Sequence, residues 1–174
     1  MEQLVAFGSD VYFLMLALLL VARSLDFLST WIGTPNLMLE GNPLAKWLGW
    51  RRGIVLNIAL CFLCALWPLP SIVLITTSVL VAARNFQYAW LMRSLGEHRY
   101  RCWVAERLNE TSMPLYLFCL LTQTFVFAAV GGALMFFSRL ELVPFAMGMG
   151  FITYGVAVAL FTLLSLWRLR RTYS

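Results

Sequence analysis

Three ionisable side chains lie inside long apolar stretches of the sequence: Arg23, Asp26 and Arg84. A charge in hydrocarbon is costly unless it is paired or hydrated, so such residues are candidates for function. Arg23, Asp26 and Thr30 follow the spacing i, i+3, i+7, which places them on one face of a helix. Asn85 follows Arg84 directly. These residues predict a polar region within the membrane.

Glu40 and Asn42 add a second carboxylate and an amide oxygen close to this region. Carboxylates and an amide could hold a hard cation, and arginines could hold a phosphate or a carboxylate group. The alternative, which we favour, is a structural network: Asp26 neutralises one arginine, Glu40 neutralises the other, and Asn42 caps the next helix. The candidates for binding a ligand or an ion are Arg23, Asp26, Thr30, Glu40, Asn42, Arg84 and Asn85. Asp26 and Glu40 would be the ligands of any metal ion, and no catalytic residue is assigned.

Cysteine and histidine chemistry is disfavoured. Cys61 and Cys64 form a C-x-x-C, but their flanks are apolar, which keeps thiols protonated and inert. We expect Cys102 and Cys119 on or near the other side of the membrane, where they cannot exchange with this pair. His98 is the only histidine, which excludes a bis-histidine haem site and a three-histidine zinc site. No cofactor is expected.

The composition indicates an integral membrane protein. Of 174 residues, 61% are hydrophobic and only 12% are charged, against about 25% charged in soluble domains. So few polar residues could not cover a soluble fold, and a disordered chain is excluded for the same reason. The net charge of +5 comes from cations at the ends of apolar stretches. It therefore indicates membrane orientation and no nucleic-acid partner.

The hydropathy pattern predicts an all-α membrane bundle in one domain, residues 1–174. A transmembrane helix needs about 20 mostly apolar residues. The expected spans are residues 11–32, 44–67, 71–93, 116–138 and 145–167. The segment Glu97–Glu110 alternates charged and apolar residues as a short helix at the membrane interface does.

The distribution of cations predicts the orientation. With five spans, one side holds ten cations and the other holds only Arg139. Under the positive-inside rule, the N-terminus lies outside and the C-terminus in the cytoplasm of a prokaryotic inner or plasma membrane. The ten are Lys46, Arg51, Arg52, Arg93, Arg99, Arg101, Arg107, Arg168, Arg170 and Arg171.

Small residues predict close packing of the last two spans. Residues four apart that allow helix backbones to approach are Ala128 and Gly132, Ala129 and Ala133, Ala146 and Gly150, and Gly155 and Ala159. We expect these helices to pack on each other, or on a second copy or another membrane subunit.

The hairpin between the first two spans carries a recognisable pattern. It reads DFLST at residues 26–30, TPN at 34–36 and EGNPL at 40–44. This run resembles an uncharacterised family of small prokaryotic membrane proteins, with D-x-x-[ST]-T ending the first helix and E-x-N-P opening the second. The resemblance draws attention to Asp26, Thr30, Glu40, Asn42 and Pro43. It implies no activity, because the family has none assigned.

Two functions remain open. The first is a non-enzymatic membrane protein: an accessory subunit of a larger complex, or an oligomeric binding or transport protein with a polar cluster facing the cytoplasm. The second is an intramembrane enzyme acting on a lipid or prenyl-phosphate head group. In that case Asp26 and Glu40 would bind metal or transfer protons, and Arg84 would hold the phosphate.

Overall fold

The computed structural model describes residues 4–173, and the side chains of residues 4–168. Within these residues helices are the only regular secondary structure, and there is no strand. Five helices are long and apolar enough to cross a membrane, as predicted: α1, α2, α3, α5 and α6. The helices are α1 (Asp10–Gly33), α2 (Pro43–Cys64), α3 (Pro68–Leu95), α4 (Glu97–Glu110), α5 (Met113–Phe137) and α6 (Leu142–Tyr173).

Helix boundaries follow from local capping chemistry. The Asn42 side chain accepts a hydrogen bond from the backbone N–H of Leu44 at 3.0 Å, and Pro43 occupies the first helical position of α2. Prolines also lie in the first turns of α3 and α5. At Gly96 the chain turns from α3 into α4 with φ of 76°, a left-handed conformation that favours glycine. The short helix predicted at Glu97–Glu110 is present with those bounds.

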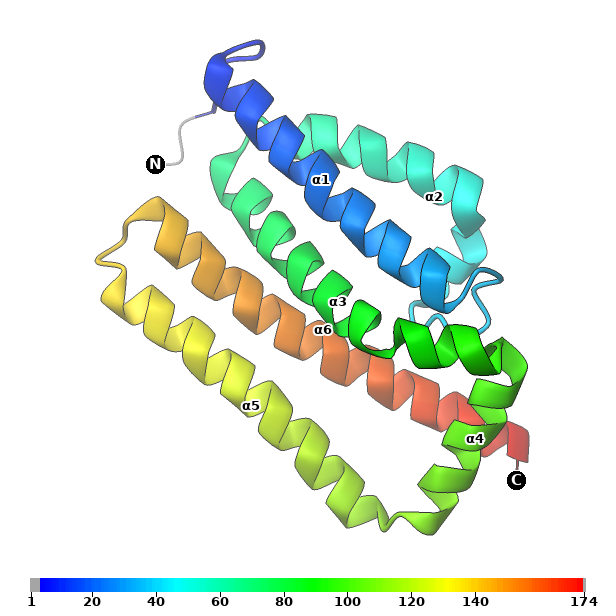
Figure 1. Ribbon diagram of the computed structural model, residues 1–174. Helices are drawn as coiled ribbons and strands as arrows, with labels where there is room; N and C mark the ends of the chain where they lie inside the picture. The colour runs from blue at the N-terminus through cyan, green and yellow to red at the C-terminus, as the bar shows by residue number, and fades with distance from the viewer. Residues whose placement is uncertain (1–3, 174) are drawn as a thin grey trace.

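The membrane-length helices lie side by side in the order α2, α1, α3, α6, α5 (Figure 1). The longest shared interfaces are α1 with α3, α5 with α6, and α3 with α6. α2 meets its neighbours much more sparingly, and a non-helical Gly49 (φ 65°) kinks it near its start. α4 crosses from the end of α3 to the beginning of α5. α3 is therefore the central element of the row.

The loop between α1 and α2, helix α4 and the C-terminal end of α6 gather at one end of the row (Figure 1). The N-terminal end of α1 lies at the opposite end. Most of the cations counted in the sequence belong to the first group of elements. The side chains of Arg170 and Arg171 lie outside the described residues, and the orientation in the membrane stays a prediction.

The contact between α5 and α6 confirms that the last two spans pack on each other, but with a different register. Gly131, not Gly132, is buried in the interface, where its backbone meets Gly148. Gly155 packs against Thr124 of α5, whereas Gly150 packs against Thr76 of α3. The small residues of α6 thus serve two neighbours, because α6 lies between α3 and α5.

Gly131→Ala and Gly132→Ala form a matched pair that tests this register. A Cβ at Gly131 would lie 2.5 Å from the Gly148 carbonyl oxygen, while a Cβ at Gly132 would meet nothing within 4 Å. We expect Gly131→Ala to cost about 1–3 kcal/mol of stability because it overpacks the interface. Gly132→Ala should be neutral or slightly stabilising, because alanine favours helix over glycine. Thermal unfolding in detergent measures both, and equal melting temperatures would contradict the register.

Candidate functional site

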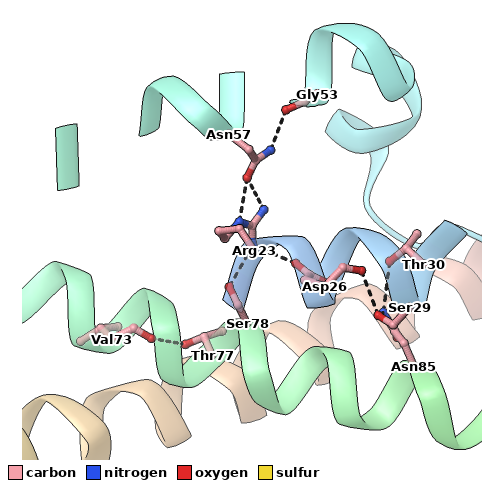
Figure 2. A network of polar contacts seen from close by, with 10 residues as sticks. All are labelled: Arg23, Asp26, Ser29, Thr30, Gly53, Asn57, Val73, Thr77, Ser78 and Asn85. Carbon is pink, nitrogen blue, oxygen red and sulfur yellow. Dashed lines mark hydrogen bonds and ion pairs between the residues drawn. The ribbon is translucent and has the colours of Figure 1, made fainter. Parts of the chain in front are cut away.

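Arg23 is the centre of a polar network between α1, α2 and α3 (Figure 2). Its Nη1 lies 2.8 Å from Asp26 Oδ2 and donates to Ser78 Oγ at 3.0 Å. Its Nε donates to Asn57 Oδ1 at 2.7 Å, and Nη2 donates to the same oxygen. Asn57 in turn donates to the Gly53 carbonyl. One guanidinium therefore receives partners from three helices.

The network continues along the interface of α1 and α3. The Ser29 hydroxyl donates to the Asp26 carbonyl at 2.8 Å, and Asn85 Nδ2 donates to Thr30 Oγ1 at 3.2 Å and to Ser29 Oγ at 3.4 Å. Ser78 and Asn85 are seven residues apart, so both lie on the face of α3 that meets α1. Arg23, Asp26, Thr30 and Asn85 thus belong to one network, with Ser29 between them.

This network is electrically balanced. The positive charge of Arg23 is matched by Asp26, and both side chains are largely shielded. Among the described residues, no buried side-chain nitrogen or oxygen lacks a hydrogen-bond partner. A charge-assisted and fully bonded pair of this kind holds helices in register. Here Asn57 is the residue that joins α2 to the polar network of α1 and α3.

The sequence predicts that Glu40 pairs with an arginine, but it forms a local turn with Asn42 instead. The Glu40 carboxylate accepts a hydrogen bond from the Asn42 backbone N–H at 2.7 Å, and Asn42 caps α2. Neither ion pair found in the described residues involves Glu40 or Arg84. The expectation that Glu40 neutralises the second arginine is therefore wrong, because the carboxylate serves its own loop. Glu40 is close enough to act electrostatically on Asp26, but no three acidic, cysteine or histidine side chains gather as metal ligands in the described chain.

Glu97 holds the loop that follows α1, a role that sequence reasoning missed. Its buried carboxylate accepts hydrogen bonds from Thr34 Oγ1 at 3.0 Å and from the backbone N–H groups of Asn36 at 2.7 Å and Met38 at 3.0 Å. Leu37, within this loop, has φ of 56°. The signal in the sequence was an acidic residue directly after Gly96, at the first turn of a helix, where a carboxylate is favoured.

Arg84 lies on a different face of α3 and does not join Asp26. It interacts with the Tyr154 hydroxyl of α6, and its charge also acts on Tyr100 of α4 and Tyr116 of α5. Tyr88, one turn along α3, acts on Tyr154 and Tyr100. Tyr154 is 3% exposed. We call Arg84 with these four tyrosines the Arg84–tyrosine cluster.

The two arginines meet different faces of α3: Arg23 contacts the face toward α1, and Arg84 belongs to the face toward α6. Thr77 and Arg84 are seven residues apart and belong to the face toward α6, where the Thr77 hydroxyl also lies 3.2 Å from the Gly150 carbonyl oxygen. Ser78 and Asn85 occupy the adjoining face toward α1. Arg84 does not form an ion pair with Asp26 or Glu40, because consecutive positions on a helix point about 100° apart and Arg84 lies on the face toward α6.

Among the described residues, the cysteines and the histidine do not form a disulfide or a metal-binding cluster. Cys61, Cys64 and Cys119 are free, and Cys61 is buried against the apolar core formed by Tyr12, Leu16 and Leu19. The His98 ring lies 3.8 Å from Cys102 Sγ on the exposed surface of α4.

Comparison with known proteins gives no relative: no family model, no curated protein and no solved structure matches this chain.

Asn57→Leu tests the link between α2 and the Arg23 network. The substitution removes the oxygen that accepts two guanidinium hydrogen bonds, so we expect a loss of about 1–3 kcal/mol. Asn57→Asp keeps an acceptor at the same position and should retain more of the stability. Thermal unfolding in detergent compares the two variants with wild type, and a Leu variant as stable as wild type would contradict the role.

Glu97→Gln tests the anchoring of the loop after α1. Glutamine keeps the shape but replaces one carboxylate oxygen by an amide that faces backbone donors. We expect a loss of about 2–3 kcal/mol, because hydrogen bonds to a charged acceptor are replaced by a donor–donor contact. Glu106→Gln, on the exposed surface of the same helix, is the control and should leave unfolding unchanged. Similar melting temperatures for the two variants would show that the loop does not depend on Glu97.

Proposed function

We propose that the chain is a non-enzymatic polytopic membrane protein that binds the phosphate head group of a lipid-like molecule at the Arg84–tyrosine cluster. The observation that carries this proposal is the contrast between two intramembrane arginines. Arg23 has a carboxylate, an amide and a hydroxyl as partners. Arg84 has tyrosines around it and no carboxylate paired with it among the described residues.

The position of Arg84 makes its charge expensive without an anion. It lies in an apolar helix, about 24 Å along α3 from Pro68 and about 16 Å before Leu95. An arginine at such a depth is stabilised by an opposite charge or by water. Tyrosine hydroxyls solvate a guanidinium, but they do not neutralise it. A phosphate group would supply the missing negative charge and accept two parallel guanidinium hydrogen bonds.

The tyrosines suit the same ligand. A phenolic hydroxyl is a hydrogen-bond donor that remains neutral near pH 7. Donors from α4, α5 and α6 could therefore contact phosphate oxygens without adding charge repulsion. Burial raises the pKa of Tyr100, on α4, above its usual value of 10, so this hydroxyl keeps its proton throughout the physiological range. The acyl or prenyl chain of the ligand would lie along the apolar surfaces of α5 and α6.

The enzymatic alternative has less support. Asp26 is held by Arg23, Glu40 accepts from its own loop, and Arg84 faces α6. A reaction at a head group held by Arg84 would need a carboxylate beside it, and the described part of the cluster contributes none. Binding is the chemistry that its residues support.

Arg84→Gln should reduce the retention of phosphate-bearing lipid by about tenfold or more, because a charge-assisted bidentate contact is lost. The measurement is native mass spectrometry of protein extracted gently from its own membrane. Arg93→Gln removes an exposed cation from the same helix and is the control. Tyr116→Phe deletes only one hydroxyl, so it remains informative if Arg84→Gln folds poorly. Equal lipid retention in Arg84→Gln, Tyr116→Phe and wild type would contradict the proposal.

A second candidate function is that of a subunit that associates with another membrane chain through α5. Ala129, Gly132 and Ala133 are exposed on this helix, and a Cβ at Gly132 would meet no neighbouring atom. Such a surface allows close approach of a second helix. Ala133→Cys should then form an intermolecular disulfide-linked product under mild oxidation in membranes. Cys119→Ser would be the background, since Cys119 is exposed on the same helix. Absence of any linked product would rule out this association.

A further inference from the structure

A cavity of about 400 Å³ lies where the loop after α1, the first turn of α2 and helix α4 come together. It is separate from the Arg84–tyrosine cluster. Its lining residues are Asn36, Leu37, Met38, Lys46 and Arg101. The α1–α2 hairpin and α4, which is distant from it in sequence, therefore build one cavity. Glu97 fixes its walls, because its hydrogen bonds join α4 to Asn36 and Met38.

The cavity has an excess of positive charge. Lys46 and Arg101 both line the cavity, and the charges of Arg101 on α4 and Arg168 on α6 act on Lys46. Lys46 Nζ donates to the Met38 carbonyl at 3.1 Å, which leaves its other two N–H groups available. Arg101 forms no ion pair within the described residues. Like charges held this close favour a bound anion.

The two carboxylates that act on Lys46 are already committed. Glu40 accepts from the Asn42 backbone, and Glu97 accepts from the loop after α1. Neither forms an ion pair with Lys46 or Arg101 among the described residues. Both carboxylates still act on Lys46, but Lys46, Arg101 and Arg168 carry three positive charges against these two negative ones, so one positive charge is in excess.

We propose that this cavity is a second anion site that binds a phosphate group through Lys46 and Arg101. Phosphate offers several strong acceptor oxygens, which match an ammonium and a guanidinium that line the same cavity. The Asn36 side chain, also in the lining, supplies an amide that can donate to the same group. The site lies at the end of the helices where α4 is found, so either a phospholipid head group or a soluble phosphate would supply the anion.

Lys46 gives a direct readout, because it is the only lysine in the sequence. Acylation of its amine by a water-soluble reagent is followed by peptide mass spectrometry on the full-length protein. We expect nanodiscs containing phosphatidylglycerol to slow this acylation by about tenfold relative to phosphatidylcholine alone. The net-anionic head group of phosphatidylglycerol would cover the amine, whereas the phosphate of phosphatidylcholine is neutralised by its own quaternary ammonium group. A parallel series in detergent uses inorganic phosphate as the probe.

Arg101→Gln keeps the lysine and removes its partner, so the protection should fall close to the phosphatidylcholine level. Arg51→Gln removes an exposed cation of α2 that does not line the cavity, and it should keep the protection. This pair separates a bound phosphate from the general effect of a negative surface, which would persist in both variants. Protection by inorganic phosphate in detergent would identify a soluble phosphate as a sufficient ligand.

The proposal is overturned if neither probe protects Lys46, or if Arg101→Gln is protected as well as wild type. Arg84→Gln provides the link to the proposed function, because it leaves this cavity intact and should keep the protection of Lys46. Lipid retention at Arg84 and protection of Lys46 are therefore measured separately. The proposed function and the second anion site can each be contradicted without the other.

Discussion

The arrangement of the first three helices depends on how the Arg23 guanidinium is solvated. In water this group would be hydrated, but between apolar helices the protein must provide every partner. Asp26 provides the charge, while Asn57 and Ser78 provide the remaining acceptors from α2 and α3. α2 touches its neighbours sparingly. This contact positions it together with the packing of Cys61 against α1 and the hydrogen bond from the Tyr12 hydroxyl to the Phe62 carbonyl. Moving α2 would leave a buried guanidinium without its amide acceptor, which is a large penalty.

α3 then divides the polar groups into two sets. The face with Ser78 and Asn85 meets α1 and completes the balanced network, whereas the face with Thr77 and Arg84 meets α6. The first set is saturated by internal partners, and the second contains a cation surrounded by hydroxyls. In the function we propose, the network holds the helices together and the Arg84–tyrosine cluster binds the ligand. α4 connects the second set to the surface, because Tyr100 contributes to the cluster and Arg101 lines the neighbouring cavity.

Much of the fold could be predicted from the sequence because bilayer thickness and hydropathy set the number and length of the helices. Capping by Asn42 and the bounds of Glu97–Glu110 were also predictable, since they rest on local chemistry. The partner of Arg84 could not be predicted from the sequence. The depth of a residue in the membrane does not tell how its helix is rotated about its own axis. The same limit applies to α5, where Gly131 and not Gly132 meets α6. Polar residues seven apart, such as Thr77 and Arg84, indicate that they share a face of α3. Only the contacts between helices show which neighbour that face meets.

The most direct test of the account measures distances between arginine nitrogen and lipid phosphorus in bilayers, using ¹⁵N-labelled arginine and ³¹P solid-state NMR. Comparison of wild type with Arg84→Lys and with Arg23→Lys isolates the signal of each guanidinium. The account predicts that the guanidinium signal lost in Arg84→Lys is strongly coupled to phosphorus, and that the signal lost in Arg23→Lys is not. An Arg84 guanidinium without phosphorus coupling, or an Arg23 guanidinium with it, would contradict the division between a saturated network and an open anion site.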